Sequence, residues 1–356
     1  MQNYKEEFQE LLSLVIKENA SDLHIAVGKH PMIRIAGGLV PLLKKEVVTP
    51  EAAEGLVKAM TTAEQYMVFK ADQELDFSYD FEGKARFRAN VYHQRGFNGA
   101  ALRLIPSKIA TFQELGLPSI LEDFCKRPQG FFLAVGPTGH GKTTTLASMV
   151  DFINHTRNDH IITIEDPIEY VFASDIAIVD QREVGLDTHS FAKAMRSMFR
   201  EDVDVAMIGE MRDPETIATA VTAAETGHLI FSTLHTNNAA QTIDRIIDSF
   251  PGGQQSQIRA QLASTLIGIV SQRLVPRVNG GLIPAVEVML ANSAVKNLIR
   301  ENKAHEIDLV IETGSDGGMV SLNRSLVDLV RRGEVTIENA AAYSLNPTEL
   351  QLLLRH

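Results

Sequence analysis

The sequence predicts an α/β protein in which a small α+β domain precedes a larger domain built on a parallel sheet. Three observations predict this fold class. Polar and apolar residues alternate before residue 106, longer apolar stretches alternate with helical patterns after residue 118, and a glycine-rich loop joins one of these stretches to a helix. With 356 residues, the chain is long enough for each domain to bury a core of its own.

The first domain is expected at residues 1–106. Apolar residues recur at helical spacing over residues 8–16, which predicts a first helix. Polar and apolar residues alternate over 76–80 and 86–93, as they do in half-buried strands, and 100–105 is expected to form the next strand. A helix combined with neighbouring strands in this way favours an α+β arrangement.

A polar stretch bracketed by two prolines, residues 107–118, is expected to link the domains. The second domain is expected at 119–356. Its first part alternates strands and helices in the successive segments FFLAV, TTTLASMVDFINHT and IITIED, which is typical of a parallel sheet with crossover helices. Its last hundred residues read as mostly helical, with a helical region at about 290–356.

Composition and charge restrict the function. The chain carries 34 basic and 45 acidic side chains, a formal net charge of −11, which argues against nonspecific nucleic-acid binding. Its one cysteine, Cys125, can form neither an internal disulfide nor a cysteine-cluster zinc site. The amino terminus has no apolar signal core, and no stretch of 18 apolar residues occurs. We expect a cytoplasmic protein that reaches a membrane through partners and does not insert directly.

The glycine-rich loop after FFLAV matches the phosphate-binding pattern G-x-x-x-x-G-K-S/T without a mismatch. Glycines let backbone N–H groups turn toward phosphates, and the start of the following helix adds partial positive charge. Lys142 is expected to reach the β- and γ-phosphates of ATP, and the Thr143 hydroxyl to ligate Mg²⁺. The His140 side chain is expected to point to solvent rather than to contact phosphate. The predicted nucleotide-binding residues are Gly136, Pro137, Thr138, Gly139, His140, Gly141, Lys142, Thr143 and Thr144.

Two acidic segments follow predicted strands. Glu165 and Asp166 end the segment IITIED, and Glu210 follows Gly209 at the end of VDVAMIGE. Ligands of parallel sheets bind beyond the carboxyl ends of the strands, so these carboxylates are expected to face the nucleotide. One would orient Mg²⁺ through water, and one would hold the attacking water. The alternative for either segment is a helix cap or a surface ion pair.

A third strand is predicted in the segment HLIFSTLHT, which runs from His228 to Thr236. A lone histidine is usually a structural residue. His235, however, would end a strand beside the phosphate loop, and this position favours a sensor of the γ-phosphate. His228 is a candidate for a supporting role.

The order of these segments resembles the bacterial secretion ATPases. GPTGHGKTT, ITIEDPIEY, QREVGLDT, IGEMRDPETI, TAAETGHLIFSTLHT and TIDRIIDSFP look like the Walker A, Asp box, Walker B and His box motifs of that family. The segments SDLH, at residues 21–24, and RFRANVYHQRG extend the similarity. The resemblance implies a PAS-like first domain, a RecA-like second domain and a ring of six chains. It also implies ATP hydrolysis with Glu210 as the general base.

The sequence departs from the usual motifs at two places. Gly209 stands where most Walker B strands end in aspartate, which matches an atypical form within the family and leaves the orientation of the metal to Glu165, Asp166 and Thr143. The loop also carries His140 and Thr143 where serine is common in close relatives. Because Thr143 keeps a hydroxyl, Mg²⁺ binding is expected to be retained.

The resemblance further implies that Arg88 and Arg103 reach a nucleotide across a subunit boundary. A hairpin centred between Arg95 and Gly96 would place these two arginines opposite each other on neighbouring strands. Two facing cations destabilise a sheet unless an anion lies between them, and a γ-phosphate is such an anion. The alternative is that nearby acids, such as Asp76 or Asp80, neutralise them.

Within the family, the features favour a motor of type IV pilus retraction. The single cysteine excludes the four-cysteine zinc module of assembly and type II secretion motors, and an extra front domain is not expected. The octet AVKNLIRE, at 294–301, resembles a signature of retraction motors. The implied partners are five copies of the same chain, an inner-membrane platform protein of the pilus and a paralogous retraction ATPase. An accessory retraction motor, a Dot/Icm-type secretion ATPase and a nucleotide-gated regulatory or scaffold subunit remain alternatives.

Overall fold

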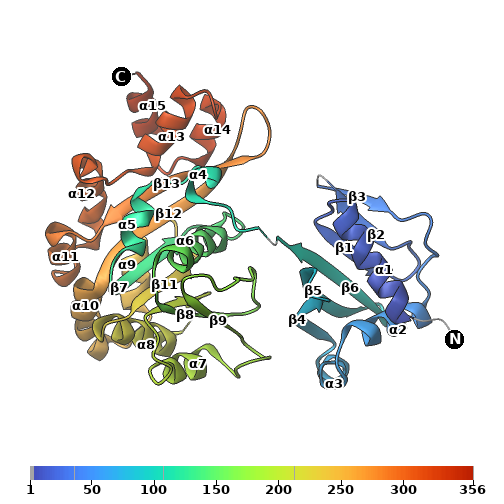
Figure 1. Ribbon diagram of the computed structural model, residues 1–356. Helices are drawn as coiled ribbons and strands as arrows, with labels where there is room; N and C mark the ends of the chain where they lie inside the picture. Colours follow the sequence, from blue (N-terminus) through green and yellow to red (C-terminus); the bar gives the residue numbers. More distant parts are fainter. Residues whose placement is uncertain (1–3, 36, 107, 212, 356) are drawn as a thin grey trace. The chain divides into compact units, whose positions relative to one another are not determined.

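The structure, a computed structural model, describes residues 4–35, 37–106, 108–211 and 213–355 (Figure 1). The chain forms two compact units. The first contains the described residues up to Lys108 together with Pro167–Val171, and the second contains Ile109–Asp166 and the described residues from Phe172 onward. Each unit has a sheet and a hydrophobic core of its own.

The first unit is a six-stranded antiparallel sheet with helices packed on one face. The strand order is β3-β2-β1-β6-β5-β4. Phe8, Leu11, Leu12 and Val15 are buried at helical spacing, so the predicted first helix is confirmed and its apolar face joins the core. The elements are α1 (Tyr4–Lys17), β1 (Asp22–Ala26), β2 (Met32–Ile35), β3 (Gly38–Pro41), α2 (Pro50–Met60), α3 (Ala63–Asp72), β4 (Glu74–Phe81), β5 (Ala85–Gln94) and β6 (Phe97–Ile105).

The hairpin between β5 and β6 has a two-residue turn. Arg95 and Gly96 both have positive φ, 51° and 83°, as a tight hairpin turn requires. The resulting register places Arg88 opposite Arg103, which confirms the predicted cross-strand pair. The same row continues through Asp22 on β1 to Arg34 on β2, because Arg103 faces Asp22 and Asp22 faces Arg34.

The second unit is built on a seven-stranded sheet in the order β13-β12-β7-β11-β10-β8-β9. Only the outer pair β12–β13 is antiparallel among these neighbours, and all other pairs are parallel. Every residue of β7, β10 and β11 is buried, as expected for strands with helices on both faces. The strands are β7 (Gly130–Val135), β8 (His160–Glu165), β9 (Ile178–Glu183), β10 (Val205–Ile208), β11 (Leu229–Leu234), β12 (Leu266–Pro276) and β13 (Leu282–Leu290).

Helices cover both faces of this sheet (Figure 1). Phe131 of β7 belongs to the larger core with α7 to α11, whereas Phe132 points the other way and packs against Phe124 of α5. The helices are α4 (Phe112–Leu115), α5 (Ile120–Cys125), α6 (Lys142–Thr156), α7 (Phe191–Met198), α8 (Pro214–Glu225), α9 (Ala239–Asp248), α10 (Gly252–Thr265), α11 (Ser293–Arg300), α12 (Ile307–Thr313), α13 (Leu322–Arg331), α14 (Ile337–Tyr343) and α15 (Pro347–Arg355), with short 3-10 turns at Ala304–Glu306 and Ser315–Gly317.

Two features of this unit differ from the sequence expectations. Helix α4 lies within the stretch assigned to a linker, where Thr111 and Glu114 form a capping box and Phe112 is buried. The last hundred residues are mostly helical, but they also contain the long strands β12 and β13, which were not predicted. β12 follows α10 without a turn signal, and an apolar run alone does not distinguish a strand from a helix.

Two further observations concern membranes and thiols. Among the described residues, no helix is both long enough and apolar enough to cross a bilayer.

Cys125 is fully buried beneath α6, with Sγ 3.7 Å from the Met149 carbonyl oxygen, and burial raises the pKa of its thiol strongly.

Glu287 is a buried carboxyl group on β13. Its Oε1 accepts the Ala239 N–H at the start of α9, at 2.8 Å. Burial, together with the nearby Asp308, raises the pKa of Glu287 to about 7 against the opposing effects of the Ala239 N–H and Arg273. The folded chain therefore keeps a proton that the unfolded chain releases between about pH 4.5 and 7, so the free energy of unfolding falls as the pH rises across this interval.

The variant Glu287→Gln should lose this pH dependence, because the amide carries no charge at any of these pH values. As the pH rises from 5.5 to 8, the free energy of unfolding of the variant should improve relative to the parent by about 2 kcal/mol. Thermal midpoints of the second unit at several pH values measure this. Glu338→Gln, at an exposed position on α14, is the control and should follow the parent. If the free energies of unfolding of Glu287→Gln and the parent differ by the same amount at every pH, the raised pKa of Glu287 is contradicted.

Candidate nucleotide site

The phosphate loop joins β7 to α6 at the carboxyl edge of the sheet. Gly136, Gly139 and Gly141 have φ of 142°, 78° and 79°, a region that side chains rarely adopt. Space is a second constraint, since a Cβ on Gly136 would lie 2.3 Å from the Gln272 carbonyl oxygen of β12. The loop therefore requires glycine at Gly136 for both backbone angle and close approach.

Lys142 folds back over its own loop. Its side chain is buried, and Nζ donates to the carbonyl oxygens of Gly136 and Pro137, at 2.9 Å each. Nζ also lies 3.2 Å from Nδ1 of His235, and the Thr138 hydroxyl lies 3.3 Å from the same nitrogen. The ammonium is thus held at the mouth of the loop by groups that phosphate oxygens can replace.

His235 connects the loop to Glu210. Its Nε2 lies 3.3 Å from Oε1 of Glu210. A lysine ammonium can only donate, so Nδ1 accepts from Lys142 and the ring hydrogen is placed on Nε2, where it can donate to the carboxylate. Side chains from the ends of three adjacent strands, β7 with its loop, β11 and β10, therefore form the continuous chain Lys142–His235–Glu210, here called the relay.

Glu165 occupies the end of β8, next to Gly209. Its carboxylate is 3% exposed and accepts from the Thr163 hydroxyl at 2.7 Å and from the Gln181 amide at 3.4 Å. A Cβ on Gly209 would lie 3.8 Å from Glu165 Cγ, an ordinary van der Waals distance, so the two residues are close neighbours but space does not require glycine at 209. Asp166, one residue further, is exposed.

Two histidines lie differently from expectation. The prediction that His140 points to solvent is wrong, because its Nδ1 accepts the Leu274 N–H of β12 at 2.8 Å. His228 precedes β11 and His235 follows it, so these histidines lie at opposite ends of the strand. His228 Nδ1 instead meets the Ala223 carbonyl oxygen at 2.9 Å, which excludes a supporting role at the relay.

The two predicted arginines belong to the first unit, where acids other than those named above pair with them. Arg103 Nε donates to Asp22 Oδ1 at 3.0 Å, and Arg88 Nη1 lies 3.8 Å from Glu169 Oε1. The Asp22 carboxylate is nearly buried and also lies 3.5 Å from Arg34 Nε. The side chains of Arg88 and Arg103 are 44% and 72% exposed.

Sequence reasoning missed Gln272 and Asp22. Gln272 lies in a strand that was not predicted, so nothing indicated that its side chain would reach the loop. Asp22 belongs to the SDLH segment, and its alternation with the buried Leu23 was the available signal that it lies on the face opposite the core.

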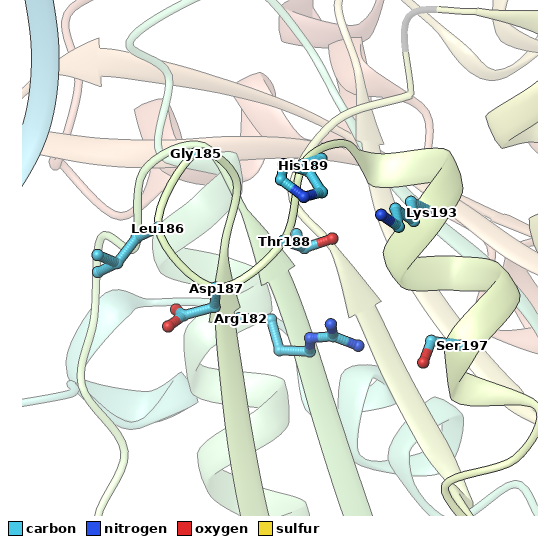
Figure 2. Close-up of a pocket in the computed structure, with 8 residues that line it drawn as sticks. All are labelled: Arg182, Gly185, Leu186, Asp187, Thr188, His189, Lys193 and Ser197. Atoms are coloured by element: carbon cyan, nitrogen blue, oxygen red, sulfur yellow. The ribbon is translucent and has the colours of Figure 1, made fainter. Parts of the chain in front are cut away.

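A separate cavity of about 320 Å³ lies beside the loop that follows β9 (Figure 2). Three of its polar side chains have partners within the chain: Arg182 and Ser197 both donate to Glu201 Oε1, at 3.0 and 2.6 Å, and Asp187 accepts the Glu183 N–H. None of the phosphate-loop residues contributes to its wall, so it does not displace the loop as the candidate site. The cavity is lined by Arg182, Gly185, Leu186, Asp187, Thr188, His189, Lys193 and Ser197.

Comparisons with known proteins identify the family of this chain. The family model described as type II/IV secretion system protein matches residues 3–306. The type IV pilus retraction ATPase PilT of Pseudomonas aeruginosa is 45% identical over 336 residues, 93% of this chain and 96% of that protein. The type IV pilus ATPase PilU of the same organism is 39% identical over 350 residues, 98% of this chain and 91% of that protein.

The fold is similar to that of a solved relative. A crystal structure of the pilus retraction motor PilT with bound ADP superimposes with a TM-score of 0.91 at 45% identity, covering 97% of this chain and 98% of that chain. This confirms the predicted α/β class and the RecA-like ATPase fold. The chain therefore belongs to the family of type II/IV secretion system proteins.

Proposed function

We propose that this chain is an ATP-hydrolysing motor that powers retraction of type IV pili and hence twitching motility. The observation that carries the proposal is the relay, which joins a phosphate-loop lysine to a carboxylate through one histidine. The similarity to PilT over almost the whole chain, and the AVKNLIRE octet, support the retraction role.

Glu210 is the proposed general base, and His235 is the proposed sensor of the γ-phosphate. Phosphate oxygens would compete with the loop carbonyls and with His235 for the Lys142 ammonium. Because His235 contacts both Lys142 and Glu210, a change at the lysine reaches the carboxylate through one side chain. A carboxylate held in this way can accept a proton from an attacking water, and this is the step that we assign to Glu210.

The residues present fit Mg²⁺ bound with ATP. Among the described residues, no group of three or more His, Cys, Asp or Glu side chains could hold a metal unaided. Mg²⁺ usually keeps several waters and takes few protein ligands besides substrate phosphates. The Thr143 hydroxyl would bind it directly, with Glu165 and Asp166 orienting its waters, and the ion would neutralise phosphate charge.

Arg88 and Arg103 are proposed to reach the nucleotide of a neighbouring copy in a homohexamer. Their cross-strand placement leaves two cations side by side with much of each side chain exposed, although Arg103 pairs with Asp22 and Arg88 lies 3.8 Å from Glu169. A phosphate of the neighbouring copy would be a further anion for these two cations.

The proposed setting is the cytoplasmic side of the inner membrane, which the ring reaches through a pilus platform protein, with a paralogous retraction ATPase as a further partner. The similarity to PilU makes an accessory retraction motor the second candidate. A secretion ATPase of the Dot/Icm type would differ in the host phenotype. A regulatory subunit with incidental hydrolysis would differ in steady-state turnover.

Glu210→Gln should bind ATP and assemble, but lose steady-state turnover by about 100-fold or more, because the amide cannot take the proton of water. Phosphate release and binding of a fluorescent ATP analogue measure the two properties. Glu338→Gln changes the same charge at an exposed position and should keep both properties. Near-normal turnover in Glu210→Gln would show that another residue is the base.

Mixed rings test whether Arg103 acts on a neighbouring copy. Arg103→Ala and Glu210→Gln should each be inactive alone, since one lacks the cation and the other the base. If the arginine acts across the boundary, a 1:1 mixture should complete about a quarter of the boundaries and regain activity. Rings that contain only Arg103→Ala, or only Glu210→Gln, are the controls. An inactive mixture that still assembles into mixed rings would place Arg103 at the nucleotide of its own chain.

The host carrying Glu210→Gln tests the retraction role. Abundant surface pili with lost surface motility are expected, because pili would assemble without being withdrawn. Electron microscopy counts the pili, and spreading at a surface measures motility. Few or no pili would indicate an assembly motor, and unchanged pili with normal motility would indicate an accessory motor or another secretion system.

A further inference from the structure

The phosphate loop is attached to strand β12 by two side chains. Gln272 is 3% exposed, and its Nε2 donates to the His140 carbonyl oxygen at 2.8 Å while its Oε1 accepts from the Thr145 hydroxyl at 2.7 Å. The His140 side chain also bonds to the strand, because its Nδ1 accepts the Leu274 N–H at 2.8 Å. Two of these hydrogen bonds therefore join the strand to the loop, and the third joins it to the first turn of α6.

These bonds set the direction of the loop amides. The carbonyl oxygens of Gly136 and Pro137 accept from Lys142, and that of Gly141 accepts the Thr145 N–H at 3.0 Å. In a planar trans peptide the C=O and the following N–H point in opposite directions. Fixing the His140 carbonyl against Gln272 thus fixes the Gly141 N–H on the opposite side, and inward-facing N–H groups are what such a loop offers to phosphate.

His140 can hold this position only with Nδ1 unprotonated. The ring is partly buried beside β12, its centroid lies 6.3 Å from that of the Tyr343 ring of α14, and the Arg273 and Lys142 cations are near enough to act on its charge. Burial lowers the pKa of His140, and the Arg273 and Lys142 cations lower it further. The neutral form is therefore the one present near pH 7, and it is the form that accepts the Leu274 N–H.

The same short segment of β12 also holds the chain that follows His235. The Ser271 hydroxyl donates to the Asn237 carbonyl oxygen at 2.8 Å, and Arg273 Nη2 donates to Asn237 Oδ1 at 3.1 Å. Neighbouring residues of a strand point to opposite faces. Gln272 therefore contacts the phosphate loop, while Ser271 and Arg273 contact Asn237, two residues after His235. A shift of the loop on β12 is therefore also a shift relative to His235.

We propose that His140 is a positioning residue of the nucleotide site, which fixes the phosphate loop to β12 by accepting the Leu274 N–H and thereby sets the affinity for nucleotide. Histidine gives this chain an acceptor that depends on protonation. The inference rests on the nucleotide-binding role of the loop but not on the identity of the pilus or on Glu210.

The test compares His140→Ala with His140→Asn, because the Asn Oδ1 can stand in for Nδ1 while carrying no proton. Binding of a fluorescent ADP analogue at pH 7.5 should weaken about five- to tenfold in His140→Ala, the loss expected for one hydrogen bond. Affinity should return to within about twofold of the parent in His140→Asn. His305→Ala, at an exposed histidine, is the control and should bind as the parent does.

The pH dependence gives a second readout that does not require His140→Ala to fold. The ratio of the parent's affinity to that of His140→Asn should fall as the pH drops below about 6.5, since a protonated Nδ1 cannot accept. Titration of the nucleotide itself cancels in this ratio. A flat ratio from pH 7.5 to 5.5, or a failure of asparagine to restore affinity lost in alanine, would overturn the proposal. Failure of the parent itself to bind nucleotide would instead refute the function of the loop.

Discussion

The site depends on the parallel alignment of neighbouring strands in the second unit. β7, β8, β10 and β11 run in the same direction, so the segments that leave their carboxyl ends meet at one edge of the sheet. No single strand carries the chemistry. Had one of them been antiparallel, its polar end would lie at the opposite edge, where His228 in fact lies. The buried and mostly apolar strands supply the stability that keeps this alignment, while the polar groups at their ends are placed to contact a ligand.

Within that frame, the relay places opposite charges at the two ends of one histidine. Lys142 and Glu210 are both partly shielded from water, so each would be costly to leave without a partner, and His235 contacts both at once. The arrangement consists of hydrogen bonds and an ion pair that phosphate oxygens can replace. A motor needs this property, because its resting contacts must give way to the substrate without disrupting the core.

Much of the fold and site follows from local sequence. The loop pattern, the acids after β8 and β10, and the Arg88–Arg103 register were predictable because turn chemistry and strand periodicity are local properties. The partners of those residues were not. Asp22 meets Arg103 across 81 positions of sequence, and Gln272 meets His140 across 132. His140 was assigned to solvent because nothing in its neighbourhood of the chain indicated a strand beside it. Contacts of this kind depend on strand order, which a single sequence does not contain.

The burial of Cys125 has a consequence for watching the molecule work. A thiol reacts as the thiolate, and burial suppresses that form, so the only cysteine of the chain is poorly reactive toward maleimide dyes in the folded protein. One cysteine introduced at an exposed position of each unit would then be labelled selectively, without first removing the native residue. Energy transfer between the two dyes would report the distance between the units during each cycle of ATP hydrolysis, with the original core intact.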